Sequence, residues 1–321
     1  MTIILEILQF LEFSFVQRAL IAGVAVAIIC SIIGLFLVLR RHSLFGDALS
    51  HMAFGGIAIG MYTNVYPIWT AFIVSILAAL AITKLRQSTN IPPDSAVAVL
   101  LSSGLALGVV LVSLSDGFSI DLFSFLFGSI LLVSVEDTLM ILVIAVTILS
   151  IVLILYRKLL YITFDEEQAK VSGLQVTKLN YLFIVLAGIT VIASMRLVGI
   201  LLISSLIVIP TITAIMFGKG FRKTALVSVS ISVLSVVTGI IISYMLNLAP
   251  GGTIVLVSVV IFIATLATKY SIKKARRFEK STIRILILLL SLLMHVITTI
   301  QYNIEGVFFI YFKIVSLAFI V

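Results

Sequence analysis

Long apolar runs recur along the whole of this sequence, separated by short polar connections. A helix rises 1.5 Å per residue, so about 20 apolar residues cross the roughly 30 Å hydrocarbon layer of a membrane. We expect nine helical spans, of which the shorter ones are completed by flanking polar residues. The runs are Ala19–Leu39, Ala48–Tyr62, Ile68–Thr83, Ala96–Ser115, Thr138–Tyr156, Leu179–Ser194, Leu197–Phe217, Ala225–Leu246 and Ile254–Thr268. The pattern predicts an all-α, polytopic membrane protein.

The composition excludes a soluble protein. Hydrophobic residues make up 62% of the 321 residues and charged residues only 11%, whereas a soluble domain carries about 25% charged residues. The net charge of +8 comes largely from basic residues grouped at the ends of apolar runs, a pattern that reflects membrane topology and not a nucleic-acid surface. Soluble enzymes and nucleic-acid binders are therefore excluded. Cys30 is the only cysteine, so the chain has no intrachain disulfide.

Basic residues predict the orientation in the membrane, because short cytoplasmic loops carry an excess of Lys and Arg. If nine spans alternate in direction, most basic residues fall on one side, which we assign to the cytoplasm. The N-terminus is then outside. The basic groups on the cytoplasmic side are Arg40–Arg41, Lys84–Arg86, Arg157–Lys178, Lys219–Lys223 and Lys269–Arg284.

Three further segments do not fit the regular pattern of spans. Met1–Ser14 carries acids and no basic residue, so we expect an interfacial helix and no cleaved signal peptide. Asp121–Val133 is too short to span, and we expect a short re-entrant or interfacial helix. Residues 1–280 form the predicted transmembrane domain. Residues 281–321 form an apolar C-terminal extension, in which Ile283–Ile300 is long enough for a tenth span.

Asp47 and His51 are ionisable residues at the start of the second span. An ionisable residue inside a membrane costs about 2.5–3.5 kcal/mol on insertion scales, so it needs a reason to be there. A spacing of four residues places both side chains on one helix face. A carboxylate and an imidazole can bind one divalent ion such as zinc or manganese. In a two-fold dimer with this helix at the axis, two copies would supply two Asp and two His.

An alternative explanation of this pair is structural. Asp47 could cap the helix after Gly46, and His51 could form a hydrogen bond to a neighbouring helix. The spacing alone does not separate this alternative from metal binding.

The cytoplasmic connection after the fifth span is a candidate docking surface for a partner. Thr163 and Glu166 fit a capping box, acids at Asp165–Glu167 favour a helix N-terminus, and Gly173 supplies a helix stop. A short helix of this kind can bind in a groove of a partner protein. The alternative is a solvated loop helix without a partner.

The chain contains no Gly-x-x-x-x-Gly-Lys-Ser/Thr phosphate-binding run, so ATP hydrolysis would need a separate subunit. The sequence argues against two classes of membrane protein. A secondary transporter driven by an ion gradient should carry several paired intramembrane acids, and the sequence offers almost none beyond Asp47. An intramembrane metalloprotease would need a His-Glu-x-x-His motif, which is missing.

Four blocks closely resemble the zinc/manganese ABC-importer permeases, the ABC-3 family, and they occur in that family's order over about residues 15 to 270. They are Leu39–His51, Asp121–Ile130, Phe164–Glu167 continuing to Ser172–Gly173, and Val198–Leu202 continuing to Ile209–Pro210. The resemblance implies a type II ABC importer-like permease in the prokaryotic plasma membrane.

The resemblance also implies the partners and the site. It implies a homodimer in membrane lipid that binds two copies of a cytoplasmic ATP-binding subunit and receives Zn²⁺ or Mn²⁺ from an extracytoplasmic metal-binding receptor, with no covalently bound cofactor. Asp47 and His51 match positions in the metal path. The ATPase-coupling residues that match are Phe164, Asp165, Glu166, Glu167, Ser172 and Gly173. The sequence from Val198 to Ser205 favours zinc narrowly over manganese.

Overall fold

The computed structural model describes residues 12–88, 93–115, 120–129, 133–274 and 289–293. The described residues are helices joined by short turns. The chain divides into two compact units after Phe262, and the candidate site lies in the first. The predicted interfacial helix at Met1–Ser14 falls almost wholly outside the described residues. Only 289–293 of the predicted C-terminal extension are described, and they are helical.

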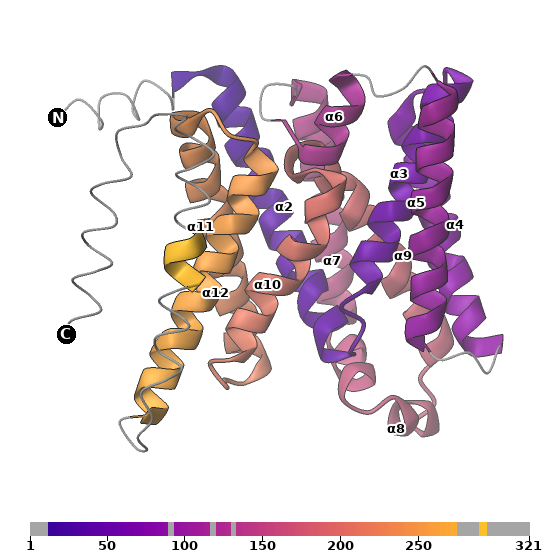
Figure 1. Cartoon of the computed structure of the whole chain (residues 1–321). Coiled ribbons are helices and arrows are strands. Elements are labelled where there is room, and N and C mark those ends of the chain that lie inside the picture. Colours follow the sequence, from indigo (N-terminus) through magenta and orange to yellow (C-terminus); the bar gives the residue numbers. More distant parts are fainter. Residues whose placement is uncertain (1–11, 89–92, 116–119, 130–132, 275–288, 294–321) are drawn as a thin grey trace. The chain divides into compact units, whose positions relative to one another are not determined.

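The first unit is built almost entirely from long helices (Figure 1). The elements are α2 (Ser14–Leu39), α3 (Phe45–Thr63), α4 (Pro67–Ser88), α5 (Pro93–Leu114), α6 (Ile120–Phe127), α7 (Val135–Phe164), α8 (Glu166–Val171), α9 (Val176–Val198), η1 (Ile200–Leu202), α10 (Ile203–Ile215), α11 (Phe221–Leu246) and α12 (Pro250–Lys274), the last of which crosses into the second unit.

The ends of the helices follow from local sequence. Proline opens α4 and α12 at Pro67 and Pro250, where its missing N–H is not needed for a helical hydrogen bond. Asn64 and Asn247 end α3 and α11 in the left-handed conformation, which asparagine tolerates better than most residues. Ser134 opens α7 by accepting a hydrogen bond from the Asp137 N–H at 3.0 Å, one half of a capping box.

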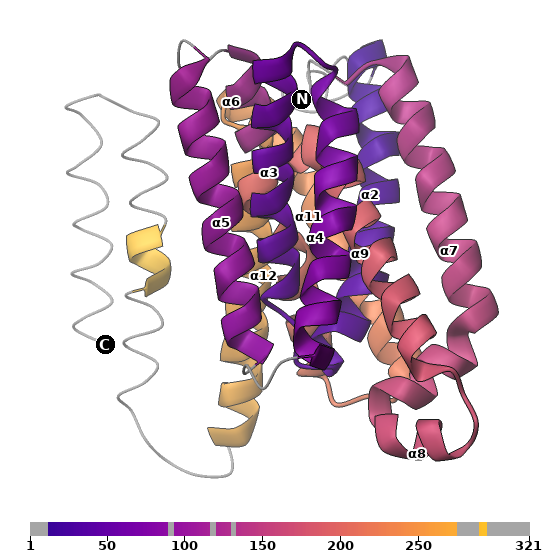
Figure 2. The same cartoon turned by 90° about the vertical axis from the view of Figure 1, so that its right-hand side faces the viewer.

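The helix that carries Asp47 and His51, α3, is enclosed by other helices. It packs mainly against α5 and α4 and also contacts α9, α10 and η1, and Figure 2 shows it between α5 and α4. Glycines make this close packing feasible. A β-carbon on Gly55 would lie 3.1 Å from the Gly104 carbonyl oxygen of α5, and one on Gly56 would lie 2.7 Å from the Ala71 Cα of α4. Small residues allow such helix contacts in membranes.

Seven helices among the described residues are long and apolar enough to cross a membrane: α2, α4, α5, α7, α9, α11 and α12. α3 coincides with the predicted second span but is not among the seven. Asp47 and His51 lower its apolar character, and most of its residues are buried inside the protein. The count of nine or ten spans therefore stays a prediction.

The predicted seventh span, Leu197–Phe217, is wrong as a continuous helix. α9 continues to Val198, the chain breaks at Gly199, and α10 begins only at Ile203 after the short η1. Gly199 has a φ of +88°, and a β-carbon there would collide with the backbone of Leu126 and Phe127 at the end of α6. Only glycine therefore fits at this break, which lies directly against the end of α6, and the apolar sequence does not reveal this contact.

A short helix occurs where Asp121–Val133 predicts one. It is α6, with 8 residues, and it ends at Gly128, whose φ is +78°. The predicted segment is therefore too long at its C-terminal end. A β-carbon on Gly251, at the start of α12, would collide with the carbonyl oxygens of Phe127 and Val198. The backbones of α6, the α9–η1 break and α12 thus touch at one point, where no side chain fits.

Candidate functional site

Asp47 and His51 lie one turn apart on the same face of α3, as their spacing predicts. The helix begins at Phe45, and its N-cap residue is Leu44, which makes no side-chain capping bond. The alternative in which Asp47 caps this helix is therefore wrong. Asp47 is instead an acid in the first turn, where the positive end of the helix dipole favours a carboxylate. Both side chains are half-buried.

The Nδ1 atom of His51 is buried and has no hydrogen-bond partner among the described residues. Leaving a buried polar group without a partner costs about 1–3 kcal/mol. This atom therefore does not make the interhelical hydrogen bond of the structural alternative. The nitrogen of a neutral imidazole is a common metal ligand, so His51 has the chemistry to bind an ion.

Neighbouring helices fix the backbone around this pair. Gly104 of α5 lies against the backbone of His51, where a β-carbon would approach its carbonyl carbon to 2.7 Å. On another side, a β-carbon on Gly46 would lie 3.8 Å from the Cα of Ser204 in α10. α5 and α10 therefore confine the part of α3 that carries both predicted ligands.

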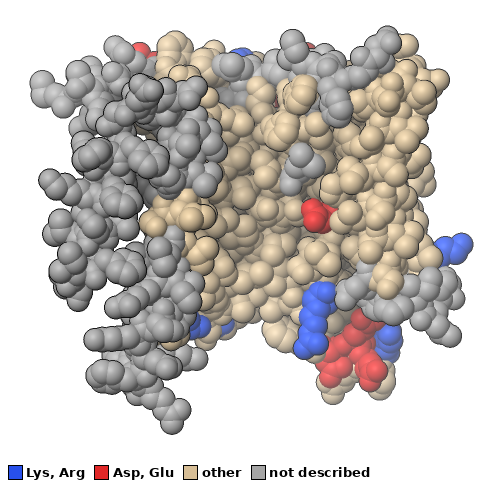
Figure 3. Space-filling model, in the orientation of Figure 1, with Lys and Arg blue, Asp and Glu red and all other residues tan. Residues whose placement is uncertain are grey.

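The described part of the chain brings no three or more His, Cys, Asp or Glu side chains together in a group that could hold a metal ion. Asp47 and His51 are a pair without a third such partner there. On the face drawn in Figure 3, acidic and basic side chains gather at the lower edge, and the middle is uncharged apart from one acidic patch.

The predicted coupling segment forms a short helix, α8, directly after α7. Asp165 is both the C-cap residue of α7 and the N-cap residue of α8. Its carboxylate accepts a hydrogen bond from the Gln168 N–H at 2.9 Å. Gly173 ends the segment with a φ of +81°, so the predicted stop is confirmed. Glu166 pairs with Lys170 at 3.0 Å on the exposed surface.

The predicted capping box of Thr163 and Glu166 is wrong. Thr163 lies inside α7, where its hydroxyl donates to the Leu159 carbonyl oxygen at 2.6 Å. The N-cap residue of α8 is instead Asp165, and its side chain binds the N–H of Gln168, the third residue of the helix. A carboxylate at the N-cap position competes well with threonine, and this signal was present in the sequence.

The surface of α8 combines acidic and apolar groups. Glu166 and Glu167 are exposed, and Phe164 and Val171 expose 67% and 88% of their surface. Ala169 faces inward and forms a small buried cluster with Ile162 and Val176, which holds α8 onto α7 and α9. The Ser172 hydroxyl donates to the Gln168 carbonyl oxygen. The segment is therefore a fixed, exposed helix with apolar residues at both ends.

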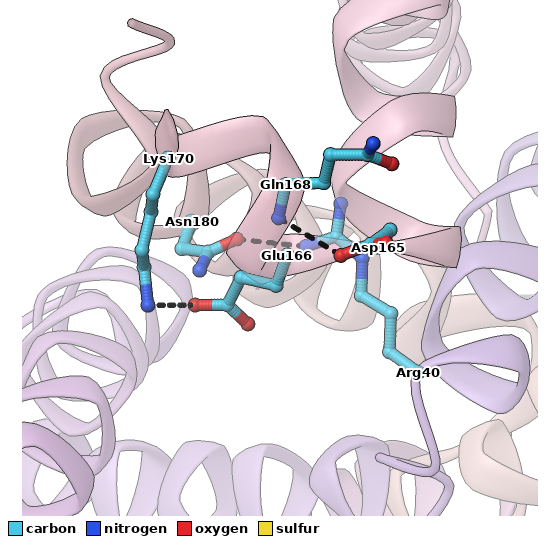
Figure 4. Close-up of polar contacts among 6 residues, drawn as sticks. All are labelled: Arg40, Asp165, Glu166, Gln168, Lys170 and Asn180. Atoms are coloured by element: carbon cyan, nitrogen blue, oxygen red, sulfur yellow. Dashed lines mark hydrogen bonds and ion pairs between the residues drawn. The ribbon is translucent and has the colours of Figure 1, made fainter. Parts of the chain in front are cut away.

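Arg40 is a residue that sequence reasoning treated only as a topology signal. It follows α2, and its Nε donates to the Thr163 hydroxyl of α7 at 2.9 Å and its Nη1 to the Asn180 amide oxygen of α9 at 2.9 Å. The guanidinium also lies 4.7 Å from the ring centroid of Phe183. Figure 4 shows Arg40 directed toward Asn180, with the Glu166–Lys170 ion pair nearby.

Burial lowers the pKa of Arg40 to about 10, although the Glu166 carboxylate acts in the opposite direction. The guanidinium therefore stays charged at neutral pH and forms charge-assisted hydrogen bonds, which are stronger than neutral ones. The partners of Arg40 lie 123 and 140 residues away in the sequence, so no local pattern predicts them.

Comparison with known proteins identifies relatives over most of the chain. The model of the ABC 3 transport family matches residues 12–269. A "Probable metal transport system membrane protein" of Treponema pallidum (strain Nichols) is 36% identical over 258 residues, covering 80% of this chain and 96% of the relative. The "Manganese import system permease protein ScaB" of Streptococcus parasanguinis is 36% identical over 252 residues, covering 78% and 90%.

A solved structure shares the fold. It is PsaBC from Streptococcus pneumoniae in complex with Fab, with a TM-score of 0.74, 33% identity, and coverage of 82% of this chain and 95% of that one. These relatives favour an ABC permease over the alternative of an ion-gradient-driven secondary transporter. They also agree with a multi-pass bacterial membrane protein, as the apolar helices predict. The chain belongs to the ABC 3 transport family.

Proposed function

We propose that this chain is the permease subunit of an ATP-driven importer for divalent transition metal ions. The observation that carries the proposal is the Asp47–His51 pair on α3. The buried Nδ1 of His51 has no hydrogen-bond partner among the described residues. A carboxylate and an imidazole suit manganese and zinc. Membership in a transport family whose named relatives import metal supports this choice of cargo.

Asp47 and His51 supply only two ligands, which is few for a tight metal site. Weak binding of this kind suits a transport path. A path must bind its ion weakly enough to release it. We propose that the permease is a homodimer in which a second copy contributes its own Asp47 and His51. Four ligands at a two-fold axis would complete a first coordination shell for an ion in transit.

We propose manganese as the first cargo to test, with zinc as the second. Two considerations support this order. The names of several relatives specify manganese. The resemblance in Val198–Ser205 favoured zinc narrowly. In the structure, Val198, Ile200 and Ile203 of this segment are buried in the apolar core. Their side chains have no atoms that can bind a metal ion, so they give no reason to prefer zinc.

The energy source and the receptor would be separate proteins. The chain lacks a nucleotide-binding motif, so we propose two copies of a cytoplasmic ATP-binding subunit that dock on the exposed α8 and its ends at Phe164 and Gly173. An extracytoplasmic metal-binding receptor would deliver the ion from the opposite side. Membership in the ABC 3 transport family supports a separate ATP-binding subunit.

Uptake of radioactive Mn²⁺ and Zn²⁺ by cells that express the complete importer tests the proposal. Asp47→Asn and His51→Ala should reduce uptake strongly at unchanged protein level. The first removes the carboxylate charge at nearly the same size, and the second removes the imidazole without adding bulk. The control is Glu136→Gln, which removes an exposed acid in the first turn of α7. Normal uptake of both ions by both variants would disprove the role of this pair.

A further inference from the structure

Arg40 lies between the two functional regions described above. On one side are α7 and α8, which carry the coupling segment, and on the other is the turn into α3, which carries Asp47 and His51. The turn spans only the residues from Arg40 to Leu44, because α2 ends at Leu39 and α3 begins at Phe45. A movement of the Arg40 side chain therefore acts close to the metal ligands.

The guanidinium of Arg40 is bound on several sides. Besides the bonds to Thr163 and Asn180, its Nη2 donates to the Leu159 carbonyl oxygen at 3.3 Å, and the Phe183 ring lies beside it. It thereby joins the last turns of α7 to the first turns of α9. A planar group with five donors can satisfy acceptors in these different directions, whereas a lysine ammonium is a point charge on a flexible stem.

The turn that follows Arg40 is itself held by hydrogen bonds. The His42 N–H donates to the Leu37 carbonyl oxygen at 2.8 Å, and the Phe45 N–H donates to the His42 carbonyl oxygen at 3.1 Å. Arg41 adopts a φ of +58°, a left-handed conformation that fixes the direction of the turn. The short turn thus connects Arg40 firmly to the first residues of α3.

The coupling segment is also connected closely to the hydrogen bonds of Arg40. Asp165 ends α7 and caps α8, so no linker separates the two helices. Thr163, which accepts the bond from Arg40, lies two residues before Asp165. A shift of α8 and the end of α7 would therefore reach Arg40 directly.

Resting on the proposed function, we propose that Arg40 is a positioning residue that couples the docked ATP-binding subunit to the metal path. Its guanidinium links α7 and α9 to the turn before α3 and so sets where Asp47 and His51 lie when the subunit moves α8. Arg41 does not share this role. Its side chain is exposed, as expected of a basic residue at the membrane surface.

The test is the number of Mn²⁺ ions transported per ATP hydrolysed by the permease and its ATP-binding subunit in proteoliposomes. In Arg40→Gln and Thr163→Val we expect this ratio to fall about tenfold, within the range of typical coupling effects, while ATP hydrolysis continues and the complex stays assembled. Arg40→Lys should not restore the ratio, because lysine cannot bind all the acceptors. Arg41→Gln, the matched control, should behave like the unaltered protein.

The outcomes separate this inference from a simple structural role. If Arg40→Gln does not assemble, Thr163→Val decides, because it removes one acceptor while keeping the shape of the side chain. An unchanged ratio in the assembled variants overturns the inference, as does full recovery in Arg40→Lys, which would mean that charge alone suffices. A failure of the unaltered complex to transport Mn²⁺ or Zn²⁺ would instead refute the proposed function.

Discussion

Gly104 of α5 lies directly against His51 of α3, so that a β-carbon on Gly104 would come within 2.7 Å of both the carbonyl carbon and the carbonyl oxygen of His51. The neighbour is backbone, which cannot rotate away as a side chain can. The position of a predicted metal ligand therefore depends on the absence of a side chain on another helix.

Gly104→Ala should displace α3 from α5 and reduce metal uptake. Overpacking of this kind costs about 1–3 kcal/mol, and the displacement acts at His51 itself. Thermal unfolding of the purified protein and uptake in cells measure the two effects. Gly252→Ala is the matched control, because a β-carbon on Gly252 would meet no described residue within 4 Å. Equal behaviour of the two variants would contradict the prediction.

Gly173→Ala and Gly199→Ala separate backbone strain from steric collision. Both glycines have positive φ, +81° and +88°. A left-handed alanine costs about 1–2 kcal/mol. Among the described residues, a β-carbon on Gly173 would meet nothing within 4 Å, whereas one on Gly199 would collide with the backbone of Leu126 and Phe127. We expect a small loss of thermal stability for Gly173→Ala and a severe loss of folded protein for Gly199→Ala. A milder effect at Gly199 than at Gly173 would argue against the close contact with α6.

Glu166→Lys combined with Glu167→Lys should weaken the interaction with the ATP-binding subunit. The double variant reverses two exposed charges on α8 and removes the Glu166–Lys170 ion pair. Surface ion pairs contribute only about 0–1 kcal/mol, so folding should survive while docking fails. Co-purification of the ATP-binding subunit and metal-stimulated ATPase activity measure the effect. Glu136→Lys, at the other end of α7, is the control for added positive charge. Normal coupling in the double variant would contradict the assignment of α8 as the docking segment.

Single cysteines test the predicted orientation. Cys30 is buried, and Cys30→Ser gives a background without a native thiol. Ser172→Cys in α8's C-cap and Asn247→Cys at the end of α11 lie on opposite sides of the predicted membrane. An impermeant thiol reagent added to intact cells should label only Asn247→Cys. Labelling of Ser172→Cys from outside would reverse the topology.

The sequence predicts most of the helical architecture because apolar runs are local signals. It does not predict the break at Gly199, since that glycine sits in an apolar run and its close contact with the backbone of α6 forms only on folding. The pairing of Asp47 and His51 on one face follows from helical periodicity alone. The burial of the His51 Nδ1, which has no hydrogen-bond partner in the described ranges, and the contacts of Arg40 depend on residues brought together only by folding.

Asp165 serves two helices at once, and this has a consequence for inhibitor design. α8 has 6 residues, whereas an isolated helix shorter than about 12–15 residues is marginal in water. Its shape depends on the preceding α7 and on Ala169 packed against Ile162 and Val176. A linear synthetic peptide that copies Phe164–Gly173 should therefore be a poor competitor for the docking groove, and an effective mimic would need a covalent constraint that replaces the support of the folded chain.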